Sequence, residues 1–539
     1  MISKLGKGIF LKLNNPRIKK IASEIPFIVI FLIIVEGPLL AVLFGLTGSI
    51  ISSSISLLAI PEMFIRRFGL LTNSLALAVA VSILTSIIGL LVAIFIWLSK
   101  WKYIKYTRYL LFLFLLVPPF LHAQAWIFFT DMLNTFLSSF TTFSIDFNGL
   151  WASAWVSSMT LLPITAGLAL IGFDSVEKEQ IEASRLFSTD SQTFFKIILP
   201  NVLNYIFAGA TLVFILSLTD YSLPSVFRFN VYALEIFADY SASGLPQNAF
   251  LLSLPILTVT LLVALTYLSW FRDKALQLSF SDNNKRTNLI LPKWLHVLGA
   301  LGIIVLLLMI FIPITNLTWE ALKAKDVSSI FFGSTSEIIY SIIIASIAAV
   351  ICQPIAYIVA NKINVLNFRG RFWWLLTSVP LAIPASLTGI GLIFLWNRPY
   401  LPDMYGSYFM PVLALVTRFT PVATIILYSA IKGRNSYLED VTRLHYPGFL
   451  RVWIRIRIPM LLPTLLSSSL LVFAFSFGEL GATLLVVPPG NSTLTIKIYN
   501  YLHYGSTSTV AVLCLCMLLL TFIPGIIAII SFAVFKRRV

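Results

Sequence analysis

The chain has 539 residues, of which 58% are hydrophobic and only 11% are charged. A soluble globular domain has far less apolar surface to bury, so this composition excludes a soluble enzyme and predicts a protein that lies in a lipid bilayer. The net charge of +16 would suit nucleic acid, but the positions of the basic residues, described below, give another reason for it.

In chain order, six apolar runs come first, and each is long enough to cross a bilayer as a helix. They cover residues 26–46, 70–99, 107–130, 150–174, 200–222 and 248–271. The first run is long and lacks a small-residue cleavage site, so we expect a retained helix and not a removed signal peptide. A polar stretch, 272–293, separates this set from six further runs at 294–316, 337–361, 372–396, 408–431, 460–484 and 509–535.

These runs predict an all-α polytopic membrane protein with about twelve transmembrane helices. We expect a first six-helix half at residues 1–271, a cytoplasmic linker at 272–293 and a second six-helix half at 294–539. Six prolines inside the runs predict kinks rather than span ends: Pro118, Pro119, Pro163, Pro354, Pro380 and Pro384. The three cysteines also lie inside apolar runs, which indicates small buried side chains rather than disulfides.

An even number of spans places both termini on one side of the membrane. Most of the 38 Lys and Arg residues fall in the connections on that side, and few fall in the opposite connections. By the positive-inside rule, we expect both termini in the cytoplasm, in a multi-pass protein of the cell (inner) membrane. The same distribution accounts for the basic charge without any nucleic-acid partner.

Two polar segments on the expected cytoplasmic side resemble each other. Residues 181–200 read IEASRLFSTDSQTFFKIILP, and residues 439–459 read EDVTRLHYPGFLRVWIRIRIP. Both open with acidic and small residues, share an Arg-Leu pair and end at a proline. Asp220 follows the first of these prolines at the same separation as Glu479 follows the second, so we interpret the chain as a duplicated six-helix unit.

The first segment, with its E-A-S-R-L-F opening, resembles the EAA loop of binding-protein-dependent ABC importer permeases. The resemblance implies a fused, two-half permease of a type I importer with the MetI-like fold, and coupling helices that dock in a groove on a cytoplasmic ATPase. The implied coupling residues are Glu182, Ala183, Ser184, Arg185, Ser188, Asp440, Arg443, His445 and Gly448. In the second copy Val441 and Thr442 replace the alanines, so we expect that loop to turn differently.

The side-chain chemistry agrees with this role. Small Ala and Ser side chains allow a helix to sit deep in a cleft. We expect Glu182 near the first turn of its helix, where it would complement the helix dipole. Residues 188–190 can end one helix and cap the next, and the apolar residues after them can lie on the ends of the spans. The alternative is an amphipathic interfacial helix without a partner.

The chain contains no G-x-x-x-x-G-K-[ST] phosphate loop, so we expect neither an enzyme nor a chain that binds a cofactor itself. The resemblance implies ATP and Mg on a partner ATPase, of which two copies would dock on the two loops. It also implies an extracytoplasmic substrate-binding protein that delivers the cargo. ATP-driven movement would then rock one half against the other. The sequence has no His/Cys cluster with metal-site spacing, so no metal site is assigned.

Two stretches bear on the cargo. LTDYSLPSVFRFNVYALEIFADYSAS (218–243) and FGELGATLLVVPPGNSTLTIKIYNYLHYGS (477–506) resemble the ferric-iron uptake branch of these permeases, which implies ferric iron, free or chelated, as the cargo. Related permeases for thiamine, phosphonates or other anions share parts of these motifs and stay open as alternatives. An ion-coupled secondary transporter is a further alternative because such proteins also contain internal repeats, but it has no reason for paired docking loops.

The candidate residues of the substrate pathway are Asp220, Tyr221, Arg418 and Glu479. Carboxylate oxygens are hard ligands that suit a ferric ion, but the two acids could instead cap helix ends or hold an outer gate. Arg418 is the only basic residue deep in a predicted span, where a charge is costly and usually functional or paired. It could line the path of an anionic cargo or pair with Glu479.

Overall fold

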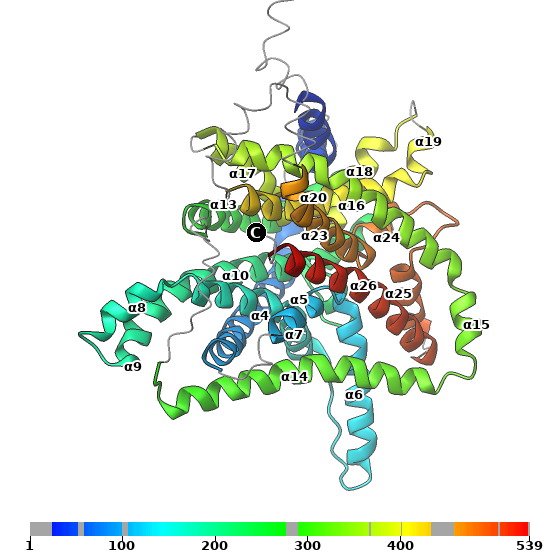
Figure 1. Ribbon diagram of the computed structural model, residues 1–539. Coiled ribbons are helices and arrows are strands. Elements are labelled where there is room, and N and C mark those ends of the chain that lie inside the picture. Colours follow the sequence, from blue (N-terminus) through cyan, green and yellow to red (C-terminus); the bar gives the residue numbers. More distant parts are fainter. Residues whose placement is uncertain are drawn as a thin grey trace, which may run out of the picture.

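The computed structural model describes residues 24–51, 59–99, 106–275, 289–365, 368–399, 402–432, 458–504 and 507–536. All regular secondary structure within these ranges is helical (Figure 1). A helix satisfies its backbone hydrogen bonds internally, which is the requirement that lipid places on a long apolar segment. The all-α fold class predicted from the sequence is therefore confirmed.

The helices of the first half follow the predicted runs, with shorter helices between them. They are η1 (Phe31–Val35), α3 (Gly37–Ile51), α4 (Ala59–Leu98), α5 (Thr107–Leu115), α6 (Pro119–Ser138), α7 (Gly149–Asp174), α8 (Lys178–Arg185), α9 (Asp190–Thr193), η3 (Phe194–Ile198), α10 (Leu199–Thr219), α11 (Ser222–Val226), α12 (Tyr232–Ser243) and α13 (Pro246–Ala275).

The second half also alternates long and short helices over its described residues. They are α14 (Lys293–Leu322), α15 (Val327–Phe332), α16 (Thr335–Ile363), α17 (Phe368–Ser378), η4 (Val379–Ala382), α18 (Ala385–Trp396), α19 (Pro402–Tyr405), α20 (Phe409–Lys432), α23 (Ile458–Phe477), α24 (Thr483–Val486), α25 (Leu494–Tyr504) and α26 (Thr507–Lys536).

Over the described residues, 9 helices are long and apolar enough to cross a membrane, and up to 12 spans result if each of 3 bent helix pairs counts as one. The bends are 52° between Glu24–Val35 and Gly37–Gly45, 102° between α5 and α6, and 103° between Phe368–Ala382 and α18. This range includes the predicted number of spans. The three bent pairs lie at the first and third runs of the first half and at the third run of the second half.

The two sharp bends fall at closely spaced prolines, Pro118–Pro119 and Pro380–Pro384. Each proline removes a backbone donor and disfavours helical geometry in the residue before it, so two in succession end a helix. The single prolines Pro163 and Pro354 stay inside the continuous helices α7 and α16. The single prolines therefore do not end a helix, as predicted, while the paired sites give breaks that are sharper than the predicted kinks.

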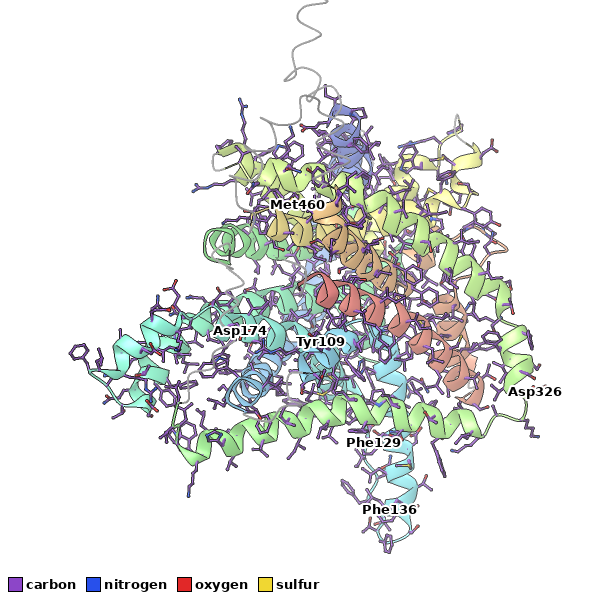
Figure 2. The ribbon with its side chains drawn as sticks, viewed as in Figure 1. Tyr109, Phe129, Phe136, Asp174, Asp326 and Met460 are labelled. Carbon is purple, nitrogen blue, oxygen red and sulfur yellow. The ribbon has the colours of Figure 1, made fainter. Side chains whose placement is uncertain are left out.

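The long helices form two bundles, and each bundle takes one helix from the other half of the sequence. α4, α7 and α10 pack together, and α16, α20 and α23 form the matching group. The first span of each half crosses over: η1 and α3 pack on α20 and α18, whereas α14 packs on α4 and α6. In Figure 2, α14 extends to the region of Asp326, and α6 continues past it to Phe136. The spatial units therefore differ from the two sequence halves.

Glycines allow both crossovers. A Cβ on Gly302 of α14 would lie 2.8 Å from Leu91 Cβ and 2.8 Å from the backbone nitrogen of Val92 on α4. A Cβ on Gly391 of α18 would lie 2.9 Å from the Cα of Pro38 on α3. Such separations are shorter than carbon atoms tolerate, so each helix pair can approach this closely only because the side chain is a hydrogen atom.

The duplication is visible in matching hydrogen bonds. Ser74 of α4 accepts the backbone N–H of Tyr232, the first residue of α12, at 2.7 Å. Ser341 of α16 accepts the backbone N–H of Leu494, the first residue of α25, at 2.8 Å. In both halves a buried serine hydroxyl thus satisfies an orphan donor at a helix N-terminus. The same short helix is thereby held on the same long helix in each half.

An ion pair repeats between the same elements with its charges exchanged. Arg67 of α4 lies 2.6 Å from Glu235 of α12, and Lys497 of α25 lies 2.9 Å from Glu337 of α16. The base lies on the long helix in the first half and on the short helix in the second. Because acid and base have exchanged places, the ion pair between the long and the short helix is present in both halves although the residues differ.

Candidate functional site

The segment between α7 and α10 is a short helical hairpin made of α8, α9 and η3, called the α8–α9 segment below. Figure 1 shows it at the edge of the molecule, beyond the long helices. Thr189 caps α9: its side chain accepts the N–H of Gln192, and the Gln192 side chain accepts the N–H of Thr189, both at 3.3 Å. This capping box confirms the predicted break and cap at residues 188–190.

Three hydroxyl groups hold α8 against α9. Ser184 Oγ lies 2.9 Å from Ser188 Oγ and 3.0 Å from Thr193 Oγ1, and the last two atoms are 2.9 Å apart. Arg185 adds an ion pair, with its Nε 2.8 Å from Asp190 Oδ1. The small residues of the motif thus have an internal structural role, because a larger side chain at Ser184 would separate the two short helices.

Glu182 does not lie where the sequence predicted. α8 begins at Lys178, its first-turn acid is Glu179, and Glu182 lies in the second turn. Its carboxylate is exposed and pairs with Lys178, one turn earlier, at 2.9 Å. The expectation that Glu182 complements the helix dipole near the first turn was therefore wrong. The motif marks the residues of the helix but not the residue at which the helix begins.

The turn between α8 and α9 exposes two large apolar side chains that the sequence analysis did not select. Leu186 is 78% exposed and Phe187 is 92% exposed. Ala183 is also exposed, whereas Ile181 on the opposite face of α8 is buried. An aromatic residue inside a polar segment, directly before a helix break, was the signal available in the sequence. Adjacent exposed apolar side chains commonly mark a contact surface.

The second segment lies outside the described residues. Asp440, Arg443, His445 and Gly448 all fall within 433–457, for which no structure is described. The segment connects α20, which ends at Lys432, to α23, which begins at Ile458. It therefore joins the same pair of helices in the second half as the α8–α9 segment joins in the first.

A cavity of about 1190 Å³ lies between the two bundles. At one end, next to the α8–α9 segment, it is lined by Lys178 and Ile181 and by the ion-paired Arg108 and Asp174. Its lining also includes Asp220 and Glu479, which follow the opposite ends of α10 and α23, and Arg418 of α20. The cavity thus connects the α8–α9 segment with three of the four candidate pathway residues.

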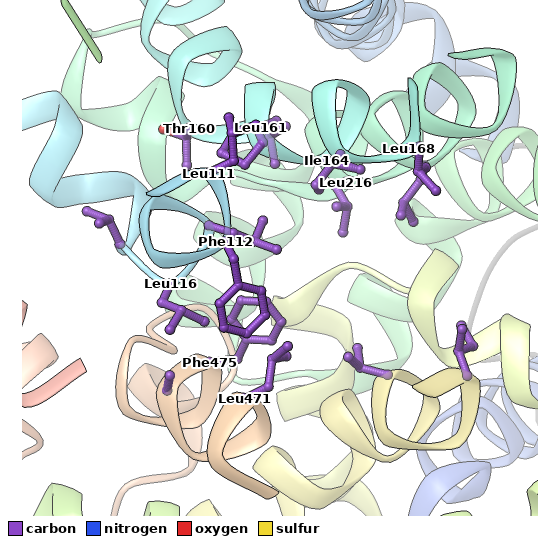
Figure 3. A pocket seen from close by; sticks show the side chains of 18 of the residues that line it. Leu111, Phe112, Leu116, Thr160, Leu161, Ile164, Leu168, Leu216, Leu471 and Phe475 are labelled. Carbon is purple, nitrogen blue, oxygen red and sulfur yellow. The ribbon is translucent and has the colours of Figure 1, made fainter. Parts of the chain in front are cut away.

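The walls of the cavity are mostly apolar. Figure 3 shows Leu161, Ile164 and Leu168 of α7 along one wall, with Leu471 and Phe475 of α23 on the opposite wall. The two walls belong to different bundles, so movement of one bundle against the other would change the width of the cavity. Apolar walls form few hydrogen bonds to a polar solute. The charged residues at the two ends are therefore the groups that could bind such a solute.

Asp220 and Glu479 both accept hydrogen bonds from the loops that follow α10 and α23. Asp220 Oδ1 accepts the backbone N–H of Ser222 at 2.9 Å and its hydroxyl at 2.7 Å. Glu479 Oε1 accepts the N–H of Ala482 at 2.8 Å, and Oε2 accepts the N–H of Thr483 at 2.9 Å. Each acid thus supports the start of the next short helix, α11 or α24.

Arg418 lies beside one of these acids. Its Nε is 3.6 Å from Glu479 Oε1, which is close enough for an ion pair but not for a hydrogen bond. Within the described part of the chain, its buried Nε and Nη1 atoms have no hydrogen-bond partner. A guanidinium with unused donors in an apolar cavity wall has a strong preference for an acceptor, which a small shift of Glu479 or a polar solute would supply.

Tyr221 joins the two loops to each other. It is only 1% exposed, and its hydroxyl donates to the carbonyl oxygen of Gly481 at 3.0 Å. Its ring stacks on Phe237 of α12, with centroids 5.1 Å apart. Residues 220–223 and 478–481, called the paired loops below, therefore meet across the boundary between the two halves and cover one end of the cavity.

The comparison with known proteins assigns the family. The family described as "Binding-protein-dependent transport system inner membrane component" matches residues 85–271 and again residues 353–539, which together are more than half of the chain. The chain belongs to this family. It is therefore the multi-pass inner-membrane permease component of an ABC importer, and not the ATPase of that importer. Membership also implies partners: an ATPase, which binds the ATP, and a substrate-binding protein.

Three similar members of the family are named for different transported solutes. The permease is 22% identical to the Fe(3+)-transport system permease protein FbpB 2 of Haemophilus influenzae over 525 residues, 93% of this chain and 97% of the relative. It is 25% identical to a putative 2-aminoethylphosphonate transport system permease protein, PhnV of Salmonella typhimurium, over 182 residues, 33% of this chain and 66% of the relative. It is 28% identical to the molybdenum transport system permease protein ModB of Mycobacterium tuberculosis over 230 residues, 39% of this chain and 83% of the relative.

Proposed function

We propose that this permease imports ferric iron, free or chelated, from an extracytoplasmic binding protein into the cytoplasm. The observation that supports this cargo is the extent of the match to two relatives named for iron. FbpB 2 and a putative ferric transport system permease protein, FbpB 1, both of Haemophilus influenzae, match 93% and 89% of this chain. The phosphonate and molybdenum relatives match only 33% and 39% of it. The fused layout is therefore shared with the iron permeases.

The energy reaches the permease through the α8–α9 segment and its counterpart in 433–457. Each segment would dock one copy of the ATPase, and the exposed Leu186 and Phe187 would enter the groove of the first copy. The distribution of basic residues supports the placement of both segments and both termini in the cytoplasm. Closure of the ATPase pair would pull the segments together and move the attached bundles.

In this proposal the cavity is the transport path with its outer end closed. The paired loops would form the outer gate, held by the Tyr221 to Gly481 hydrogen bond and by the pair of Arg418 and Glu479. The cavity then leads from this gate toward the cytoplasmic end at Lys178. Movement of the bundles would separate the loops, admit the cargo from the binding protein and close the inner end.

An anionic cargo is the second candidate. Arg418 lines the cavity and has unused donors, whereas both acids already accept hydrogen bonds from residues that follow them in the chain. A phosphonate or another small oxyanion would satisfy the guanidinium directly. The phosphonate and molybdenum relatives supply two specific solutes to test as this second cargo. The secondary-transporter alternative has no such support, because the family works with an ATPase.

An uptake assay in proteoliposomes would identify the cargo. The permease, its ATPase and its binding protein would be placed in proteoliposomes and supplied with radiolabelled ferric citrate, 2-aminoethylphosphonate, molybdate or thiamine. We expect ATP-dependent uptake of iron alone, and no uptake without the binding protein. Uptake of one of the other solutes in place of iron would overturn the cargo while leaving the importer assignment intact.

A Phe187→Asp variant tests the docking of the α8–α9 segment. Aromatic residues at the centre of an interface contribute about 2 kcal/mol or more to binding, so we expect the affinity for the ATPase to fall about 30-fold. The side chain is almost fully exposed, so the fold of the permease should be unchanged. Affinity would be measured by biolayer interferometry on the purified permease in nanodiscs.

Phe140→Asp is the matched control, because Phe140 is also an exposed phenylalanine but lies beyond α6, far along the chain from the α8–α9 segment. It should bind the ATPase as the unchanged permease does. Equal affinity of the Phe187 variant and this control would exclude the exposed tip from the ATPase interface.

A further inference from the structure

The end of the linker between the two halves is bonded to the α8–α9 segment. The backbone N–H of Ile290 donates to Asp190 Oδ2 at 2.6 Å, and the other oxygen of the same carboxylate pairs with Arg185 at 2.8 Å. Asp190 is the first residue of α9, so one carboxylate joins α8, α9 and the linker. A charge-assisted hydrogen bond of this kind gives the linker end a defined position on the segment.

Packing on both sides of this bond holds the linker end in place. The rings of Trp294 and Phe195 are stacked, with centroids 6.0 Å apart and planes 16° from parallel. Leu291 and Leu295 are buried in the same core cluster as Ile181 and Phe194 of the α8–α9 segment. Leu289, directly before Ile290, also packs against this cluster, so Ile290 lies between two packed neighbours.

The side chain of Ile290 points away from this packing. It is 84% exposed, in the same range as Leu186 and Phe187 at the tip of the segment. Burial of an isoleucine side chain is favourable, so an isoleucine that is held in place and exposed is available for contact with a partner. Leu186, Phe187 and Ile290, called the apolar patch below, all lie on the α8–α9 segment or on the linker end bonded to it.

We propose that the linker end is part of the ATPase-docking surface, with Ile290 as the contact that the linker adds to the apolar patch. This inference rests on the proposed function of the α8–α9 segment. The ATPase is the occupant that fits because Ile290 is hydrogen-bonded to Asp190 of the segment that we propose to dock it. Ile290 is also held by the Asp190 carboxylate, which itself pairs with Arg185, and such charged groups belong in a hydrated layer rather than among acyl chains.

Such a contact would give the linker a mechanical role. α14 begins at Lys293, directly after the anchored residues, and packs along α4 and α6 of the first half. A partner that holds the α8–α9 segment and Ile290 together would move α14 with the first bundle. The first ATPase copy would thereby control a helix that belongs to the second half of the sequence.

The test compares Ile290→Asp with Phe187→Asp in the binding assay described above. We expect Ile290→Asp to weaken binding of the ATPase roughly tenfold, because a carboxylate would replace a buried apolar contact. Leu322→Asp is the matched control, since Leu322 is an exposed apolar residue at the opposite end of α14, and it should bind normally. The backbone hydrogen bond to Asp190 does not depend on the side chain, so the fold is kept.

The outcomes separate the two proposals. If Phe187→Asp binds weakly and Ile290→Asp binds normally, the linker contact is overturned while docking by the α8–α9 segment stands. If both variants bind normally, the proposed function of the segment fails as well. An Ile290→Cys variant adds a second readout: protection from maleimide labelling by added ATPase supports the contact, whereas protection by the lipid of the nanodisc alone overturns it in favour of membrane contact.

Discussion

Replacement of Glu479 by Ala is expected to destabilise the permease by about 3 kcal/mol or more and to abolish uptake. The change leaves the N–H groups of Ala482 and Thr483 without an acceptor and leaves Arg418 without its ion-pair partner. Removal of one member of a buried charge pair typically costs about 3–5 kcal/mol, because the remaining charge is uncompensated. Thermal unfolding in detergent, followed by intrinsic fluorescence, would measure the loss, and proteoliposome uptake would measure the transport.

Two variants serve as controls for this experiment. Asp220→Ala removes two hydrogen bonds that both come from Ser222, on a less buried residue, so we expect a smaller loss of about 1 kcal/mol. Glu479→Gln keeps one carbonyl acceptor but loses the charge, and its stability should fall between the wild type and the Ala variant. A Glu479→Ala protein that unfolds at the normal temperature and transports normally would show that the carboxylate supports neither the start of α24 nor Arg418.

Replacement of Gly302 by Ala is expected to cost about 1–3 kcal/mol, the usual range for an overpacked site. The new methyl group would lie 2.8 Å from Leu91 Cβ and 2.8 Å from the backbone nitrogen of Val92, so α14 would have to move away from α4. A backbone atom cannot turn aside as a flexible side chain can. The change should appear as a lower unfolding temperature and as aggregation on size-exclusion chromatography.

Gly69→Ala is the control for this substitution. A Cβ at Gly69 of α4 would meet nothing within 4 Å. Alanine is favoured over glycine within a helix by up to about 1 kcal/mol, so this variant should be as stable as the wild type or slightly more stable. Equal unfolding temperatures for the two alanine variants would show that the contact between α14 and α4 does not require glycine.

Several features of the fold could be predicted because their causes are local. Runs of apolar residues determine where helices cross lipid, and prolines mark where a helix bends, although the breaks at the paired prolines are sharper than the predicted kinks. The capping box at Thr189 could be located from Thr189 and Gln192, whose side chains bond to each other's backbone. The start of α8 could not, because no single residue type marks it, and so Glu182 was placed in the wrong turn.

The candidate sites were predicted unevenly for the same reason. The α8–α9 segment was located from its motif, and Asp220 and Glu479 from their equal spacing after the two prolines. Their partners could not be located. Tyr221 donates to Gly481, which lies in the other half of the chain, and Asp190 accepts from Ile290 of the linker. Contacts between distant residues leave no periodic pattern in a sequence.

The sequence by itself predicted a duplicated helical membrane protein with a similar polar segment between corresponding apolar runs of each half. Only the tertiary structure decided that α3 and α14 cross to the opposite bundles, and that the paired loops meet at the end of the cavity. The physical reason is that lipid tails are as apolar as leucine, so hydrophobicity places a helix in the membrane without choosing its neighbour. The fit of the helix surfaces selects the neighbour, at close contacts such as Gly302 against Leu91 and Gly391 against Pro38.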